Sequence, residues 1–218
     1  MKLKKYLIAN GNSTLLIWGC PVTRRKELVA KYLARYEQVG FVTISELRIP
    51  TLSMMGNELC INATLALASS LGQTGQLYTS GLDTPIRYTN SQKQTSIKFQ
   101  METLRTGKIV ILSGIGYVLL RDSSRVSKSL LRGFSEKFNL PAFGAIITDG
   151  YKMTPVVYVK DTDSMIYETA CGSGSIALNV LINAEKILQP SGEEIKVKRK
   201  QNTFTVKAKV VKIDRSIR

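Results

Sequence analysis

One eight-residue pattern occurs twice in this chain, at Cys60–Leu67 (CINATLAL) and Cys171–Leu178 (CGSGSIAL). Both copies read cysteine, any residue, small polar, small, hydroxyl, branched aliphatic, alanine, leucine. Each opens an apolar run of helical character, which places each cysteine at or just before a helix N-terminus. Unpaired N–H groups and the helix dipole favour a thiolate there and bind anions. The pattern predicts two thiols of lowered pKa that act on opposite sides of one substrate carbon; two buried structural cysteines are the alternative.

The order of predicted elements repeats on a larger scale. Helices are predicted over residues 23–36, from Cys60 to about residue 72, from Ser123 or Ser124 to about residue 138, and from Cys171 to about residue 188. Strands fill most of the remainder, and residues 193–213 read as a closing hairpin. We therefore expect two pseudo-symmetric α/β halves, residues 1–106 and 107–218, with the site in the cleft between them. The last strand is able to pair back onto the first half.

Composition limits the chemistry that the chain can perform. Its 218 residues include three cysteines and no histidine, so the usual general base and the commonest zinc ligand are missing. The cysteines have no metal-ligand or disulfide spacing, which indicates reduced thiols and no metal site. No apolar run reaches the 18 to 20 residues, roughly, that span a bilayer. We expect a soluble, cytoplasmic protein.

The formal net charge is +15, which raises the possibility of a nucleic-acid or polyanion-binding protein. The basic residues are spread along the chain with acidic residues between them, however, and no basic-aromatic alternation or zinc-finger spacing accompanies them. Solvated basic faces are the simpler interpretation. Nucleic acid is therefore not expected as a partner.

Four separated motifs resemble the diaminopimelate epimerase family of pyridoxal-independent amino-acid racemases and epimerases. Thr169–Gly174 (TACGSG) resembles the second active-site signature of that family. Gly11–Thr14 (GNST), Glu37–Phe41 (EQVGF) and Gly56–Thr64 (GNELCINAT) are similar to one branch, the histidine racemases of opine-metallophore (staphylopine-type) synthesis. The resemblance implies an α+β fold of two halves, each a curved, mostly antiparallel sheet around a central helix. It also implies an isomerase that needs no cofactor, acts on histidine or a related amino acid, and forms a homodimer.

The resemblance also implies a role for each matched residue. Cys60 and Cys171 take the two catalytic positions, one thiolate removing the Cα proton while the opposite thiol delivers another. Among the implied substrate-binding residues, Asn12 is the asparagine of the first turn, and Glu37 is the acidic residue that faces the substrate side chain. Asn62, Ala63, Gly172 and Ser173 hold the α-carboxylate. Glu168 is the acidic residue shortly before the second cysteine.

The chain departs from the family pattern at one position beside the first cysteine. The family has glycine there and this chain has Ile61, whose branched side chain narrows or reshapes the anion site. This departure motivates one further alternative, a family member that binds an amino acid without turning it over. An isomerase of the phenazine-biosynthesis type shares the architecture, but the paired cysteines favour a racemase.

Overall fold

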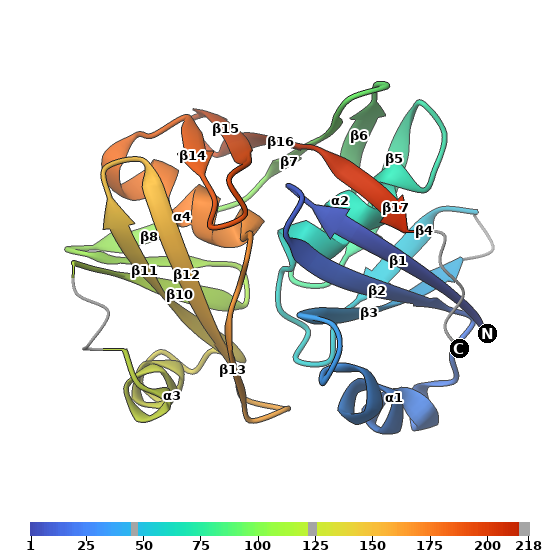
Figure 1. Ribbon diagram of the computed structural model, residues 1–218, viewed down its shortest axis with the longest axis horizontal. Coiled ribbons are helices and arrows are strands. Elements are labelled where there is room, and N and C mark those ends of the chain that lie inside the picture. Colours follow the sequence, from blue (N-terminus) through green and yellow to red (C-terminus); the bar gives the residue numbers. More distant parts are fainter. Residues whose placement is uncertain (45–47, 122–125, 214–218) are drawn as a thin grey trace.

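The computed structural model describes residues 1–44, 48–121 and 126–213. It is a mixed α+β fold, mostly sheet, as predicted (Figure 1). The helices are α1 (Arg25–Tyr32), which follows the short 3-10 turn Val22–Arg24, α2 (Ile61–Ser69), α3 (Lys128–Lys137) and α4 (Gly172–Ile182). The strands are β1 (Lys2–Ile8), β2 (Asn12–Trp18), β3 (Gln38–Ile44), β4 (Pro50–Ser53), β5 (Thr74–Thr79), β6 (Ile86–Asn90), β7 (Thr95–Gln100), β8 (Leu104–Thr106), β9 (Ile109–Leu112), β10 (Ile115–Leu120), β11 (Ala142–Asp149), β12 (Lys152–Val159), β13 (Ser164–Tyr167), β14 (Lys186–Leu188), β15 (Glu194–Lys200), β16 (Thr203–Ala208) and β17 (Val210–Ile213).

The first set of strands surrounds α2. Strands β1 to β7 pair in sequence order, with parallel pairs at β2–β3 and β4–β5 and antiparallel pairs elsewhere. The end of the chain closes this set, because β17 pairs with β1 and β16 pairs with β7. The last strand therefore lies on the N-terminal strands, next to α2 (Figure 1).

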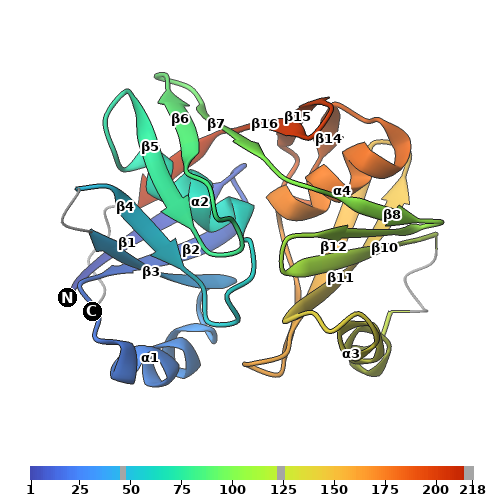
Figure 2. The same cartoon turned by 180° about the vertical axis from the view of Figure 1, so that it is seen from behind.

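The second set of strands surrounds α4 (Figure 2). Strands β8 to β12 pair in order, β10–β11 being the parallel pair, and β13 extends the set from β12. Strand β14 pairs with β12 and β15, and β15 forms the predicted closing hairpin with β16. Because β16 also pairs with β7, the hydrogen-bonded ladders run continuously from one set into the other.

The two cysteine helices are buried on all sides, whereas α1 and α3 cover outer faces. Every residue from Ile61 to Ala68 in α2 and from Gly172 to Leu181 in α4 is buried, as expected for helices that are apolar or small all round. Helix α1 packs Leu28 and Val29 on the outer side of β2 and β3, and α3 packs Leu131 on β10 to β12. This arrangement places both cysteines inside the molecule.

Three helix boundaries differ from the predictions. Helix α4 ends at Ile182 rather than near residue 188, because Asn183 adopts a left-handed conformation (φ 59°) and the chain then forms β14. Helix α1 ends at Tyr32, one turn early. Ser127 caps α3 by accepting a hydrogen bond from Leu130 N–H; the predicted caps, residues 123 and 124, lie outside the described residues.

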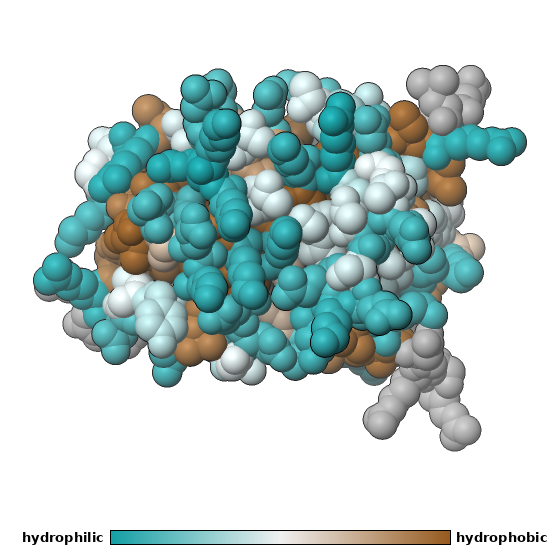
Figure 3. All heavy atoms as spheres, turned by 90° about the horizontal axis from the view of Figure 1, so that it is seen from above, coloured by the Kyte–Doolittle hydropathy of each residue, from teal (hydrophilic) through white to brown (hydrophobic). Residues whose placement is uncertain are grey.

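Hydrophilic side chains cover most of the face seen from above, with smaller hydrophobic areas between them (Figure 3). Strands β15 and β16 contribute exposed basic residues, among them Lys198, Lys200 and Lys207. This agrees with solvated basic strand faces. No helix in the described part of the chain is both long enough and apolar enough to cross a membrane.

Candidate active site

Both repeated cysteines cap the N-terminus of their helix. Cys60 and Cys171 have extended backbones. Each sulfur atom accepts a hydrogen bond from the backbone N–H group three residues later in the chain, Ala63 at 3.5 Å and Gly174 at 3.2 Å. The hydroxyl of the repeat also has the same partner twice: Thr64 and Ser175 each donate to the carbonyl of their own cysteine at 2.7 Å. The repeat is therefore a capping motif that holds a buried thiol at a helix N-terminus.

The two helix N-termini contact each other. The side chain of Asn62 in α2 accepts a hydrogen bond from Gly172 N–H and donates one to the Ala170 carbonyl, both at 2.9 Å. Ile61 fills the space beside Gly172, since a Cβ atom built on Gly172 would lie 2.3 Å from Cγ2 of Ile61. Two groups predicted to hold a substrate carboxylate, Asn62 and Gly172, are thus hydrogen-bonded to each other.

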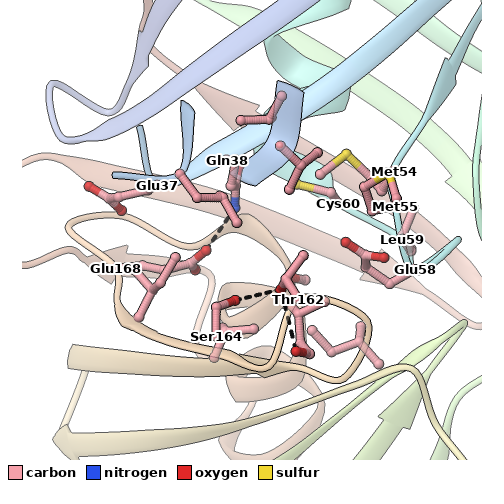
Figure 4. A pocket seen from close by; sticks show the side chains of 18 of the residues that line it. Glu37, Gln38, Met54, Met55, Glu58, Leu59, Cys60, Thr162, Ser164 and Glu168 are labelled. Atoms are coloured by element: carbon pink, nitrogen blue, oxygen red, sulfur yellow. Dashed lines mark hydrogen bonds between the residues drawn. The ribbon is translucent and has the colours of Figure 1, made fainter. Parts of the chain in front are cut away.

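A pocket of about 630 Å³, its mouth included, adjoins this junction (Figure 4). Its wall is apolar apart from three carboxyl groups, a thiol and a few hydroxyl and amide groups. The polar lining residues are Glu37, Gln38, Glu58, Cys60, Tyr117, Thr162, Ser164, Glu168 and Ser173. Cys171 does not line the pocket, but it contacts two of these residues: Tyr117 Oη lies 3.4 Å from its sulfur and Ser173 Oγ lies 3.7 Å from it.

Glu37 connects Asn12 to the segment before the second cysteine. Its Oε2 accepts hydrogen bonds from Asn12 Nδ2 and Thr169 N–H, both at 3.0 Å, and its Oε1 accepts one from Thr169 Oγ1 at 2.6 Å. The structure brings Asn12 and Glu37 together, and Glu37 lines the pocket. Their contacts also show that Glu37 joins residues far apart in the chain.

Glu168 lies on the pocket wall and is buried. Its Oε1 accepts a hydrogen bond from Gln38 Nε2 at 2.7 Å, while Oε2 has no hydrogen-bond partner within the described residues. Burial raises the pKa of Glu168 to about 7; the neighbouring Cys171 thiol opposes the shift and the charge of Glu37 adds to it. A carboxyl group of this pKa can take up or release a proton near neutral pH.

Comparison with known proteins identifies relatives along most of the chain, although no protein-family model matches it. The chain is 28% and 27% identical to histidine racemases from two strains of Fusobacterium nucleatum, over 84% of its length and 83% and 84% of theirs. The chain is therefore similar, along most of its length, to proteins named as amino-acid racemases. A predicted epimerase from Pseudomonas aeruginosa has the same fold (TM-score 0.67, 10% identity, 98% of this chain and 97% of that one). So does a phenazine-biosynthesis PhzC/PhzF protein from Clostridium difficile (TM-score 0.60, 13% identity, 99% of both chains).

The two thiols differ from the prediction in their acidity. Burial is the largest effect and raises the pKa of both Cys60 and Cys171, far more than the helix N–H groups lower it. The negative charge of Glu168 raises both values further, and Glu58 adds to the effect at Cys60. The prediction of lowered thiol pKa values is therefore wrong for this structure. It used the helix end alone, whereas tertiary burial dominates.

Sequence reasoning missed three residues at the site. Tyr117 is buried on β10, and its hydroxyl contacts Ser173 Oγ at 2.7 Å as well as the Cys171 thiol. Gln189 accepts a hydrogen bond from Cys171 N–H at 2.9 Å. Glu58 lines the pocket, although its motif reads only as a turn. Its place two residues before the capping cysteine was the one available signal.

Proposed function

We propose that this protein is an amino-acid racemase or epimerase that needs no pyridoxal or other cofactor and uses Cys60 and Cys171 as its two acid/base groups. The observation that carries the proposal is the duplicated capping motif: two helices present equivalent thiols at N-termini that contact each other beside a pocket. Two residues with the same local geometry suit a reaction whose forward and reverse directions are equivalent. The family relationship to histidine racemases supports it and makes histidine or a related amino acid the first candidate substrate.

The proposed reaction transfers one proton at each face of Cα. One cysteine thiolate takes the Cα proton and becomes a thiol, and the electron pair stays on the substrate as a carbanion. The opposite thiol then donates its proton to the other face and becomes a thiolate. The helix N-termini stabilise the negative charge that develops on the carboxylate side. Glu168, which interacts with the Cys171 thiol, is suited to take up the proton that this thiol must first lose.

The larger arrangement belongs to the same proposal. We infer that the two sets of strands, each with a buried cysteine helix and one outer helix, are the pseudo-symmetric halves 1–106 and 107–218. The pocket between them is then the active-site cleft. The homodimer and the cytoplasmic location follow from the resemblance alone and stay predictions.

The test is exchange of the Cα hydrogen in D2O, followed by NMR with reduced protein and a panel of L-amino acids that includes histidine. Exchange of one substrate should be lost in both Cys60→Ala and Cys171→Ala. Cys20→Ala is the matched control, because this third buried cysteine donates its thiol hydrogen bond to the Pro21 carbonyl and packs in the cluster under α1, apart from the two cysteine helices. Exchange that survives in either single variant would refute the two-base assignment.

A binding protein without turnover is the second candidate. Ile61 fills the helix junction and Asn62 is hydrogen-bonded to Gly172, so two groups expected at the carboxylate already have partners. This candidate predicts that an amino acid binds, by calorimetry, with no Cα exchange even after long incubation. Ile61→Gly would then be the first variant to examine for gained exchange.

A further inference from the structure

One carboxyl oxygen of Glu58 is buried and accepts no hydrogen bond from the residues that the structure describes. The residue is 6% exposed, and its Oε2 has no hydrogen-bond partner in the described parts of the chain. Burial raises the pKa of this carboxyl, although the backbone N–H groups of Glu58 and Gly56 partly offset the shift. An unsatisfied buried carboxyl oxygen costs free energy unless a ligand supplies a donor. Glu58 is one of the residues that line the pocket.

The backbone at Glu58 is held firmly in place. Gly81 and Gly114, both with positive φ, approach so closely that a Cβ atom would lie 2.7 Å from Leu59 N and 3.0 Å from Glu58 Cα, respectively. Ser80 Oγ donates a hydrogen bond to the Glu58 carbonyl at 2.8 Å. The backbone that carries the Glu58 side chain is therefore fixed by contacts with distant segments.

The carboxyl groups lie on two sides of the pocket (Figure 4). Glu58 lies beside Met55 and Leu59, and Glu168, whose Oε2 also has no partner among the described residues, lies on the side of Glu37. Glu37 differs from both because each of its oxygens accepts hydrogen bonds. The negative charges of Glu58 and Glu168 both raise the pKa of the Cys60 thiol, so a ligand bound at Cys60 also interacts with these charges.

We propose that Glu58, together with Glu168, binds an N–H donor on the side chain of the amino-acid substrate and so selects amino acids with cationic or N–H-donating side chains. The inference rests on the proposed racemase function. An apolar side chain would leave both carboxyl oxygens buried and unpaired, and a site of this kind rejects a ligand that lacks the donor. Glu58 is thus a specificity residue, distinct from the acid/base pair.

The test compares substrates that match in size and differ in the donor: L-lysine with L-norleucine, and L-histidine with L-2-thienylalanine. Wild-type protein should exchange Cα–H of the donor substrate with a kcat/KM at least about 100-fold higher than that of its apolar partner. Glu58→Gln should lower kcat/KM for the preferred donor substrate about 10- to 100-fold, the range of a charge-assisted hydrogen bond. Exchange of the apolar partner should not fall, because it makes no such bond and loses nothing when Glu58 is replaced.

Glu136→Gln is the matched control, since it removes one carboxylate from the exposed face of α3. An equal loss for donor and apolar substrates would assign Glu58 to the α-ammonium group or to folding and would overturn the inference, as would an unchanged profile. If wild-type protein exchanges no amino acid, the proposed function fails instead. Calorimetric binding of the same substrate pairs to wild type and Glu58→Gln then decides the inference by itself: it holds only if the donor partner binds more tightly and the variant loses that preference.

Discussion

The contact between the two helix N-termini can be tested by a pair of substitutions. A methyl group at residue 172 would lie 2.3 Å from Cγ2 and 2.8 Å from Cβ of Ile61, whereas carbon atoms in contact lie about 3.5–4.0 Å apart. Gly172→Ala therefore forces a buried side chain or a helix end to move by about 1 Å, and overpacking of this kind costs about 1–3 kcal/mol. Ile61→Ala leaves a cavity at a fully buried site and should cost about 2–5 kcal/mol.

The double variant separates a true contact from two independent effects. With alanine at residue 61, the nearest atom, Cγ2, is gone and only Cβ remains at 2.8 Å from the new methyl group, so Gly172→Ala should cost less than it does in wild type. The two substitutions should then couple by about 1–2 kcal/mol. Urea unfolding, followed by the fluorescence of the single tryptophan, Trp18, gives each free energy. Gly133→Ala in α3 is the control, because nothing lies within 4 Å of its added Cβ and better helix propensity should stabilise the protein by up to about 1 kcal/mol.

Additive costs, within about 0.5 kcal/mol, would show that residues 61 and 172 are not in contact. The junction of α2 and α4, and the account of the anion site based on it, would then be wrong. A coupling of the expected size, by contrast, would mean that Ile61 occupies the space between the helix ends in solution.

Three further predictions concern single side chains. Because the folded pKa of Glu168 is raised from 4.5 to about 7, its contribution to stability is present below pH 4.5 and lost as the pH rises through 7. Between pH 4.5 and 8, wild type should thus lose about 3 kcal/mol relative to Glu168→Gln in denaturant unfolding, and parallel curves would contradict this. Tyr117→Phe removes a hydroxyl that lowers the pKa of Cys171, so iodoacetamide should alkylate that thiol more slowly. Ser127→Ala removes the cap on Leu130 N–H and should cost about 1 kcal/mol in thermal unfolding; an unchanged melting temperature would exclude the cap.

Local patterns predicted the parts of the site that local structure determines. The repeat placed Cys60 and Cys171 at helix N-termini because capping depends on atoms within four residues, and the sulfur and hydroxyl bonds recur in both copies. The burial of both helices agrees with their apolar character. The hydrogen bond between Asn12 and Glu37 was not predicted, because no local signal connects two segments 25 residues apart.

The remaining features depend on contacts between distant segments. The position of Glu58 is set by Gly81 and Gly114, far away in sequence, and nothing in its own turn reveals them. The end of α4 at Asn183 was missed because the apolar run continues into β14, where strand pairing takes over from helix propensity. The prediction of lowered thiol pKa values failed for the same reason. The burial that raises these values depends on the whole fold, whereas the cap depends on one turn of helix.

Burial of Cys60 between Glu58 and Glu168 has a consequence for how a substrate would be turned over. Both carboxylates oppose a negative charge on the thiol, so a ligand that brings positive charge to the pocket makes thiolate formation easier. Recognition of the substrate side chain and activation of the Cys60 base are then linked. A substrate without a donor should have a lower kcat as well as a higher KM.

The same reasoning predicts a change in the protein without substrate. In a Cys20→Ala, Cys171→Ser background, where Cys60 is the remaining thiol, Glu58→Gln should raise the rate of alkylation by iodoacetamide at pH 8 several-fold, because the variant removes a charge that disfavours the thiolate. Glu136→Gln should leave the rate unchanged, since its carboxylate is exposed on α3. An equal rate in Glu58→Gln and its parent would mean that Glu58 does not influence Cys60, and the link between recognition and activation would fail with it.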